Sequence, residues 1–117
     1  MKRVLVCGGR DYTDMLCVDR TLKTVHLKHG IGILIHGACE GADSLCRDWA
    51  EAHGIHAAGV EALWSFYGNP AGPKRNAAML ILQPELLVAF PGGKGTANMV
   101  RQATEAGVPL HRASDLP

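Results

Sequence analysis

The chain has 117 residues, of which 47% are hydrophobic and 20% are charged. This length fits one domain of ordinary size and can bury a core without a metal ion or disulfide bonds. Twelve Lys and Arg residues against eleven Asp and Glu residues leave a formal charge of +1, which argues against a broad basic surface for nucleic acid or an anionic membrane. We therefore expect one domain over residues 1–117 that meets any anionic ligand locally.

No apolar segment approaches the length of a membrane-spanning helix or of a secretory signal. The stretch 80–90 is interrupted by Gln83, Pro84 and Glu85, whereas a membrane span needs about 20 apolar residues. The apolar run 4–7 ends at two glycines and is too short for a signal peptide. We predict a cytoplasmic protein that does not contact a membrane.

Four cysteines, at positions 7, 17, 39 and 46, include no C-x-x-C pair. Without an export signal, free thiols are more typical of such a chain than a disulfide framework or a zinc site. We expect neither a bound metal nor a cofactor.

Short β-rich runs alternate with helical patterns along the whole chain. Strands are predicted at 3–7, 32–36, 55–60, 86–90 and 109–112. Helices are predicted at 14–29, 42–53, 73–82 and 96–106. The stretch 61–72 is predicted to be irregular. Continuous apolar strands between helices are typical of a parallel sheet that is covered on both faces. We predict a Rossmann-like α/β three-layer sandwich, with a parallel sheet of about five strands and helices on both faces.

Ligands of such folds bind outside the carboxyl ends of the strands, so the strand-to-helix junctions are the candidate site. At the first junction, Gly8 and Gly9 let the backbone approach a ligand, and Arg10 adds a forked donor. A plain tight turn is the alternative. The spacing differs from G-x-G-x-x-G and does not indicate dinucleotide binding of the usual kind.

At the second junction, Gly37 and Gly41 bracket Glu40, and Asp43 falls in the first turn of the next predicted helix. Either carboxylate is a candidate acid or base. Helix capping is the structural alternative, and it suits Asp43 better than Glu40. His36 ends a buried strand and is more typical of a core histidine than of a catalyst.

The predicted irregular stretch contains three aromatic residues, Trp64, Phe66 and Tyr67. A long loop in a compact domain is commonly a lid or a binding element. Its rings either stack on a base or cover the edge of the sheet. Lys74 and Arg75 follow in the predicted first turn of a helix, where cations oppose the helix dipole unless an anion binds, so we interpret both as ligand groups.

The fourth junction reads Pro91-Gly92-Gly93-Lys94-Gly95-Thr96. Three glycines leave no Cβ in the way of a phosphate, Thr96 supplies a cap hydroxyl, and the following helix directs its first N–H groups to the same place. A flexible surface turn is the alternative. The pattern is not a P-loop, because G-x-x-x-x-G-K-[ST] is absent.

Four motifs follow one another along nearly the whole chain. They are Gly8-Gly9-Arg10-Asp11, His36-Gly37-x-x-x-Gly41-Ala42-Asp43, Tyr67-Gly68-x-x-Ala71-Gly72-Pro73-x-Arg75-Asn76-x-x-Met79 and Pro91-Gly92-Gly93-x-Gly95-Thr96. Together they resemble the DUF2493, or YspA/YpsA-related, branch of the SLOG superfamily. That superfamily includes the Lonely Guy phosphoribohydrolases, which cleave the N-glycosidic bond of nucleoside 5′-monophosphates, and the DNA-processing protein A group, which binds single-stranded DNA. The resemblance implies a pocket for a nucleotide or a sugar phosphate, with P-G-G-x-G-T holding the phosphate, and a homo-oligomer.

The resemblance also implies roles for two positions. Arg75, with Met79 at the family spacing, matches an arginine that serves catalysis in the hydrolases. Asn98 stands where those hydrolases have a glutamate, and an amide can neither ionise nor take up a proton. Cleavage of a glycosidic bond needs a carboxylate, so Glu40 or Asp43 would have to substitute.

We therefore predict a protein that binds a nucleotide or a nucleotide-derived ligand through a glycine-rich phosphate loop. Two forms of this function stay open. One is hydrolysis of the N-glycosidic bond of a nucleoside 5′-monophosphate, with Glu40 or Asp43 as the acid or base and Arg75 as the other catalytic residue. The other is non-catalytic sensing or sequestration. Single-stranded nucleic-acid binding is a third, weaker hypothesis, because the near-neutral charge supplies no extended basic groove. The predicted ligand-binding residues are Gly8, Gly9, Arg10, Gly37, Gly41, Lys74, Asn76, Pro91, Gly92, Gly93, Lys94, Gly95, Thr96 and Asn98.

Overall fold

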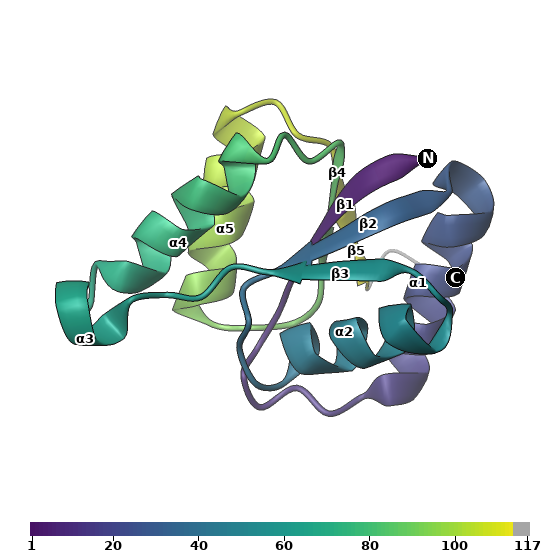
Figure 1. The fold of residues 1–117 in the computed structure, drawn as a ribbon, viewed down its shortest axis with the longest axis horizontal. Helices are drawn as coiled ribbons and strands as arrows, with labels where there is room; N and C mark the ends of the chain where they lie inside the picture. Colours follow the sequence, from purple (N-terminus) through teal and green to yellow (C-terminus); the bar gives the residue numbers. More distant parts are fainter. Residues whose placement is uncertain (114–117) are drawn as a thin grey trace.

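The computed structural model describes residues 1–113 (Figure 1), so residues 114–117 of the expected domain lie outside the described part. The strands are β1 (Lys2–Cys7), β2 (Ile31–His36), β3 (His56–Gly59), β4 (Leu86–Ala89) and β5 (Leu110–Arg112). The helices are α1 (Met15–His29), α2 (Ala42–Ala52), α3 (Trp64–Tyr67), α4 (Ala71–Ile81) and α5 (Lys94–Glu105).

The five strands form one sheet in the order β3-β2-β1-β4-β5, and every neighbouring pair is parallel. This confirms the predicted Rossmann-like α/β fold. The chain moves outward from β1 to β3 and then returns to place β4 beside β1. The strand order therefore reverses between β1 and β4, and this switch point is where ligands of open α/β sheets bind.

Helices α1 and α2 pack on one face of the sheet, and α4 and α5 pack on the other (Figure 1). Side chains alternate along β1 because successive residues of a strand point to opposite faces. Val4 and Val6 pack with Trp49 on the α1–α2 side, whereas Leu5 packs with Met79 on the α4–α5 side. The two cores fix both helix layers against the central strands.

Local signals set several helix ends as predicted. The side chain of Asp14 accepts a hydrogen bond from the N–H of Cys17 at 3.0 Å, and α1 ends at Gly30, which has a φ of 73°. A positive φ of this size suits glycine, which has no Cβ to clash with the backbone.

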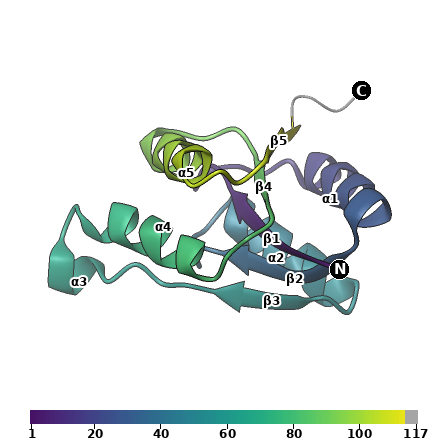
Figure 2. The same cartoon turned by 90° about the horizontal axis from the view of Figure 1, so that it is seen from above.

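The prediction was wrong in the region 61–73 and at the start of α5. The stretch 61–72 is not irregular throughout, because it contains α3 and the beginning of α4. Pro73 is the third residue of α4 and not its first, which a helix tolerates because the N–H groups of its first turn have no partner within the helix. Similarly, α5 begins at Lys94, with Gly93 as its cap residue and no side-chain capping bond, so Thr96 does not cap it. Figure 2 shows α3 lying beyond the carboxyl ends of the strands.

All four cysteines are free thiols, as predicted. Within residues 1–113, no helix combines the length and the apolar character that a membrane span requires.

Candidate functional site

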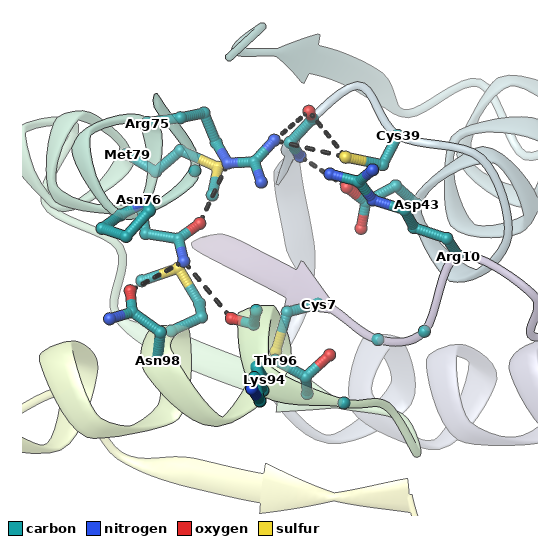
Figure 3. Close-up of a pocket in the computed structure, with 18 of the residues that line it drawn as sticks. Cys7, Arg10, Cys39, Asp43, Arg75, Asn76, Met79, Lys94, Thr96 and Asn98 are labelled. Atoms are coloured by element: carbon teal, nitrogen blue, oxygen red, sulfur yellow. Dashed lines mark hydrogen bonds between the residues drawn. The ribbon is translucent and has the colours of Figure 1, made fainter. Parts of the chain in front are cut away.

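A cavity of about 640 Å³ opens at the carboxyl ends of β1, β2 and β4, where the strand order reverses. Residues 8–11 line it after β1, Gly37 and Cys39 line it after β2, and residues 93–96 line it after β4. Side chains from α2, α3, α4 and α5 complete the wall, and Figure 3 shows several of them. The cavity therefore gathers the junctions that lie far apart in the sequence.

The glycines after β4 have two different functions. A Cβ added to Gly93 or to Gly95 would meet no other atom within 4 Å, so both face open space. A Cβ on Gly92 would clash with the Thr96 hydroxyl and lie 2.7 Å from the backbone nitrogen of Gly9. Gly92 is thus required by packing against the loop after β1, whereas Gly93 and Gly95 leave the start of α5 accessible.

Arg75 reaches from α4 across to the loop after β2 (Figure 3). Its Nη1 donates to the carbonyl oxygen of Gly37 and lies 3.3 Å from Cys39 Sγ, and its Nε donates to Asn76 Oδ1 at 2.9 Å. These contacts hold the guanidinium on the cavity wall.

Lys74 and Arg75 are the fourth and fifth residues of α4 and do not open its first turn, so the predicted conflict of both cations with the helix dipole is weaker than expected. Lys74 does not line the cavity. Its ammonium lies 4.8 Å from the ring centroid of Tyr67.

Asp43 is a buried carboxyl group in the cavity wall, with 6% of its surface exposed. Burial raises its pKa from 3.8 to about 6, although the N–H of Gly37 and the cations of Arg75 and Arg10 oppose this shift. Gly41 occupies the cap position of α2 without a side-chain bond, so Asp43 does not cap the helix. A carboxyl group that titrates close to neutral pH inside a cavity is suited to taking up or releasing a proton.

The other candidates of the second junction lie elsewhere. Glu40 is exposed and does not line the cavity. Gly41 has a φ of 76°, and a Cβ there would clash with the carbonyl oxygens of Gly9 and Arg10, so this glycine permits a close backbone approach. His36 is buried, and its Nδ1 accepts a hydrogen bond from the N–H of Ala38 at 3.0 Å.

Amide side chains join α4 to α5 beside the cavity. Asn76, which is 3% exposed, donates to Asn98 Oδ1 at 3.0 Å and to the carbonyl oxygen of Gly95 at 3.3 Å. Gln102 also donates to Asn98 Oδ1, at 2.7 Å. Asn98 therefore serves as an acceptor between two helices, a role that an amide fills without a charge.

The structure brings most of the predicted site residues together. Those that line the cavity are Gly8, Gly9, Arg10, Gly37, Asp43, Arg75, Asn76, Gly93, Lys94, Gly95, Thr96 and Asn98. Those that do not are Glu40, Gly41, Lys74, Pro91 and Gly92. Pro91 and Gly92 instead line a second cavity of about 450 Å³.

Sequence reasoning missed some lining residues, among them Cys7, Cys39 and Asn69. Cys39 lies between the two glycines of the second junction, and that position was a usable signal. Cys7 carried no signal, because its apolar strand predicts only burial.

A parallel Rossmann-like sheet, with a ligand-sized cavity at its switch point, defines the class of this α/β protein. The chain belongs to the YspA, cpYpsA-related SLOG family, whose model matches residues 2–67. It is similar to the Gene 61 protein of Mycobacterium phage D29, with 31% identity over an alignment of 125 positions that covers 100% of both chains.

Solved structures of other proteins share the fold, among them the following two. DNA processing protein A (DprA) from Streptococcus pneumoniae matches 96% of this chain with a TM-score of 0.77 and 15% identity, and the match covers 50% of the DprA chain. The present chain thus spans half of that protein. The Moco carrier protein from Chlamydomonas reinhardtii matches 95% of this chain and 75% of its own, with a TM-score of 0.65 and 20% identity.

Proposed function

We propose that this protein binds a nucleotide or a nucleotide-derived ligand in the main cavity, with the phosphate of the ligand at the amino terminus of α5. The observation that carries the proposal is the open space in front of Gly93 and Gly95, where an added Cβ would meet no atom within 4 Å. Helix α5 has no side-chain cap, so its first N–H groups are available to a ligand. Such groups bind anions through hydrogen bonds and the helix dipole.

Three cationic side chains line the same cavity. Arg10, Arg75 and Lys94 all line the cavity, although the formal charge of the whole chain is only +1. The three cations outnumber the two carboxyl groups of the lining, Asp11 and Asp43, which favours an anionic ligand. The cavity volume of about 640 Å³ also falls within the range of about 300–1,000 Å³ that is usual for small-molecule sites.

The structural relatives are named for the carriage of Moco and for the processing of DNA. We favour a small ligand over a nucleic acid, because single-stranded nucleic acid usually binds along an extended basic groove with stacking aromatic residues. In this protein, Arg10, Arg75 and Lys94 line a single cavity and form no extended groove.

The test of this proposal is a binding measurement with Gly93→Val. We expect calorimetry with ribose 5-phosphate and the four common nucleoside 5′-monophosphates to detect binding to the wild type. The valine side chain should fill the open space and weaken binding by about tenfold or more, as the loss of one or two charge-assisted hydrogen bonds would. Ala77→Val is the matched control, since Ala77 is exposed on α4 and does not line the cavity. Unchanged affinity in Gly93→Val would contradict the proposal.

The position of Asp43 favours a second candidate function, hydrolysis of the N-glycosidic bond of a nucleoside 5′-monophosphate. Water would add to the anomeric carbon, and the base would leave with a proton, giving ribose 5-phosphate and free base. Asp43 is the carboxyl group of the predicted pair that lines the cavity, and its raised pKa suits proton transfer close to neutral pH.

Product analysis separates hydrolysis from binding without turnover. Chromatography after incubation should show free base for a hydrolase, whereas intact nucleotide recovered after denaturation indicates sequestration. Asp43→Asn should abolish hydrolysis, and Glu40→Gln, which changes an exposed carboxylate outside the cavity, should not. Full turnover in Asp43→Asn would remove Asp43 from the mechanism. Asn98→Asp should increase hydrolysis, because it restores a carboxylate at the position where the related hydrolases have one.

A further inference from the structure

Trp64, the first residue of α3, is the aromatic member of the cavity lining. Its side chain is 43% exposed, whereas Trp49, the other tryptophan, is 1% exposed in the core. Large exposed aromatic surface at the edge of a ligand cavity commonly serves recognition, because its burial on binding contributes favourable free energy.

The indole ring of Trp64 packs against a glycine of α4. A Cβ added to Gly72 would lie 3.0 Å from Trp64 Cη2, which is tighter than almost all real Cβ contacts. Gly72 is itself buried. The edge of the ring therefore rests against α4 in a space that a side chain would fill, and this contact positions the ring.

The guanidinium of Arg10 lies over the face of the same ring, with 5.0 Å between Cζ and the ring centroid. Arg10 comes from the loop after β1 and Trp64 from the segment after β3, so the contact joins two separate parts of the cavity lining. Arg10 forms no ion pair with any residue in the range 1–113. The ring thus holds the cation over its face.

A nucleobase can replace this cation with a net gain. Stacking of a base on an aromatic ring contributes more binding free energy than an exposed cation–π contact does. The displaced guanidinium would then be available to the phosphate of the ligand.

We infer that the base of the bound nucleotide stacks on the exposed face of Trp64, in place of the Arg10 guanidinium. Trp64 is then the residue by which the site prefers a nucleotide to a sugar phosphate. This inference rests on the proposed function, because it needs the phosphate at α5 to place the base within reach of Trp64.

The other aromatic residues of α3 provide a control. Phe66 is 79% exposed and packs against Tyr67, with ring centroids 4.8 Å apart. Neither side chain lines the cavity. If the rings of α3 serve only as general apolar cover, removal of either Trp64 or Phe66 should have similar effects on ligand binding.

The experiment compares Trp64→Leu, Trp64→Phe and Phe66→Leu in the full chain by calorimetry, with ribose 5-phosphate and the four nucleoside 5′-monophosphates. We expect the wild type to bind at least one nucleotide about fivefold or more tighter than ribose 5-phosphate. Trp64→Leu should abolish this preference, and its affinity for ribose 5-phosphate should not fall, because the released Arg10 guanidinium stays available to the phosphate. Trp64→Phe should restore part of it, and Phe66→Leu should leave it intact.

Tryptophan fluorescence gives a second measurement. A stacked base should quench the emission of Trp64, and ribose 5-phosphate should not. Trp49 is buried, so the quenching should disappear in Trp64→Phe. A nucleotide preference that survives in Trp64→Leu, or a wild type without such a preference, would overturn the stacking alone, provided that Gly93→Val still weakens ribose 5-phosphate binding. If none of these phosphates binds, or if Gly93→Val binds them normally, the proposed function fails and the stacking with it.

Discussion

The carboxylate of Asp43 accepts a hydrogen bond from the backbone N–H of Gly37, with 2.9 Å between Oδ2 and the nitrogen. This bond ties the first turn of α2 to the loop after β2 inside the cavity. By itself it favours the ionised carboxylate, as do the nearby arginines. Burial has the larger effect and raises the pKa of Asp43 to about 6, so the removal of water controls the charge of this group.

Stability should therefore depend on pH through Asp43. Because its folded pKa lies above 3.8, the folded state binds more protons than the unfolded state between about pH 4 and about pH 6. The stabilising contribution of the protonated group is present at low pH and is lost as the pH rises through about 6. Asp43→Asn lacks this titration, so its free energy of unfolding relative to the wild type should rise by up to about 3 kcal/mol from pH 4 to pH 7.

Urea denaturation at a series of pH values measures this difference. Glu40→Gln is the control, because it removes an exposed carboxylate three residues away and should give a curve close to that of the wild type. Parallel curves for Asp43→Asn and the wild type would show that Asp43 titrates alike in both states.

The two adjacent glycines after β4 should respond differently to alanine. Gly92→Ala places a Cβ 2.7 Å from the backbone nitrogen of Gly9, so the two loops must separate, and we expect a loss of about 1–3 kcal/mol in the free energy of unfolding. Gly93→Ala meets open space and should change stability by about 0.5 kcal/mol or less. Thermal or chemical denaturation of both variants tests this, and equal losses would refute the distinction.

The amide contacts between α4 and α5 should matter for stability through Asn76. Asn76→Ala removes a buried group that donates to Asn98 and Gly95 and accepts from Arg75, so we expect a loss of about 1–3 kcal/mol. Asn98→Asp keeps an oxygen that accepts from Asn76 and Gln102, so its free energy of unfolding should fall by less than that of Asn76→Ala. Denaturation curves of the two variants measure which one loses more stability. A larger loss in Asn98→Asp than in Asn76→Ala would mean that the network does not stabilise the helix pair.

The four thiols should differ in reactivity. Cys7 and Cys46 are buried, and burial raises the pKa of Cys7 to about 12 and also raises that of Cys46. Since the thiolate is the reactive form, native protein treated with iodoacetamide near pH 8 should be alkylated at the half-buried Cys17 and Cys39 and not at the two core positions. Peptide mass spectrometry identifies the alkylated cysteines.

A bound nucleotide should protect Cys39 from alkylation, because Cys39 lines the cavity, and should not protect Cys17. Alkylation of Cys7 at the rate of Cys17 would contradict the buried placement.

Much of the fold could be predicted from local patterns. Apolar residues at helical spacing between Asp14 and Gly30 define α1, and uninterrupted apolar runs mark the central strands. The short helix α3 could not be predicted in this way, because its side chains are all exposed and its four residues are too few for a periodic pattern.

The site was predictable as a set of junctions, but the choice among neighbouring residues was not. Asp43 lies in the cavity and Glu40 outside it, although only three positions separate them. Arg75 reaches the loop after β2, while the adjacent Lys74 turns to Tyr67. Adjacent helix residues point about 100° apart, so only one of such a pair faces a given partner.

The sequence by itself determined the alternation of strands and helices and the glycine-rich junctions, because backbone geometry and side-chain periodicity act over a few residues. Only the tertiary structure decided which side chains share the cavity. It placed Arg10 over Trp64 and raised the pKa of Asp43, because both effects depend on segments that are distant in the sequence and that the order of the sheet brings together.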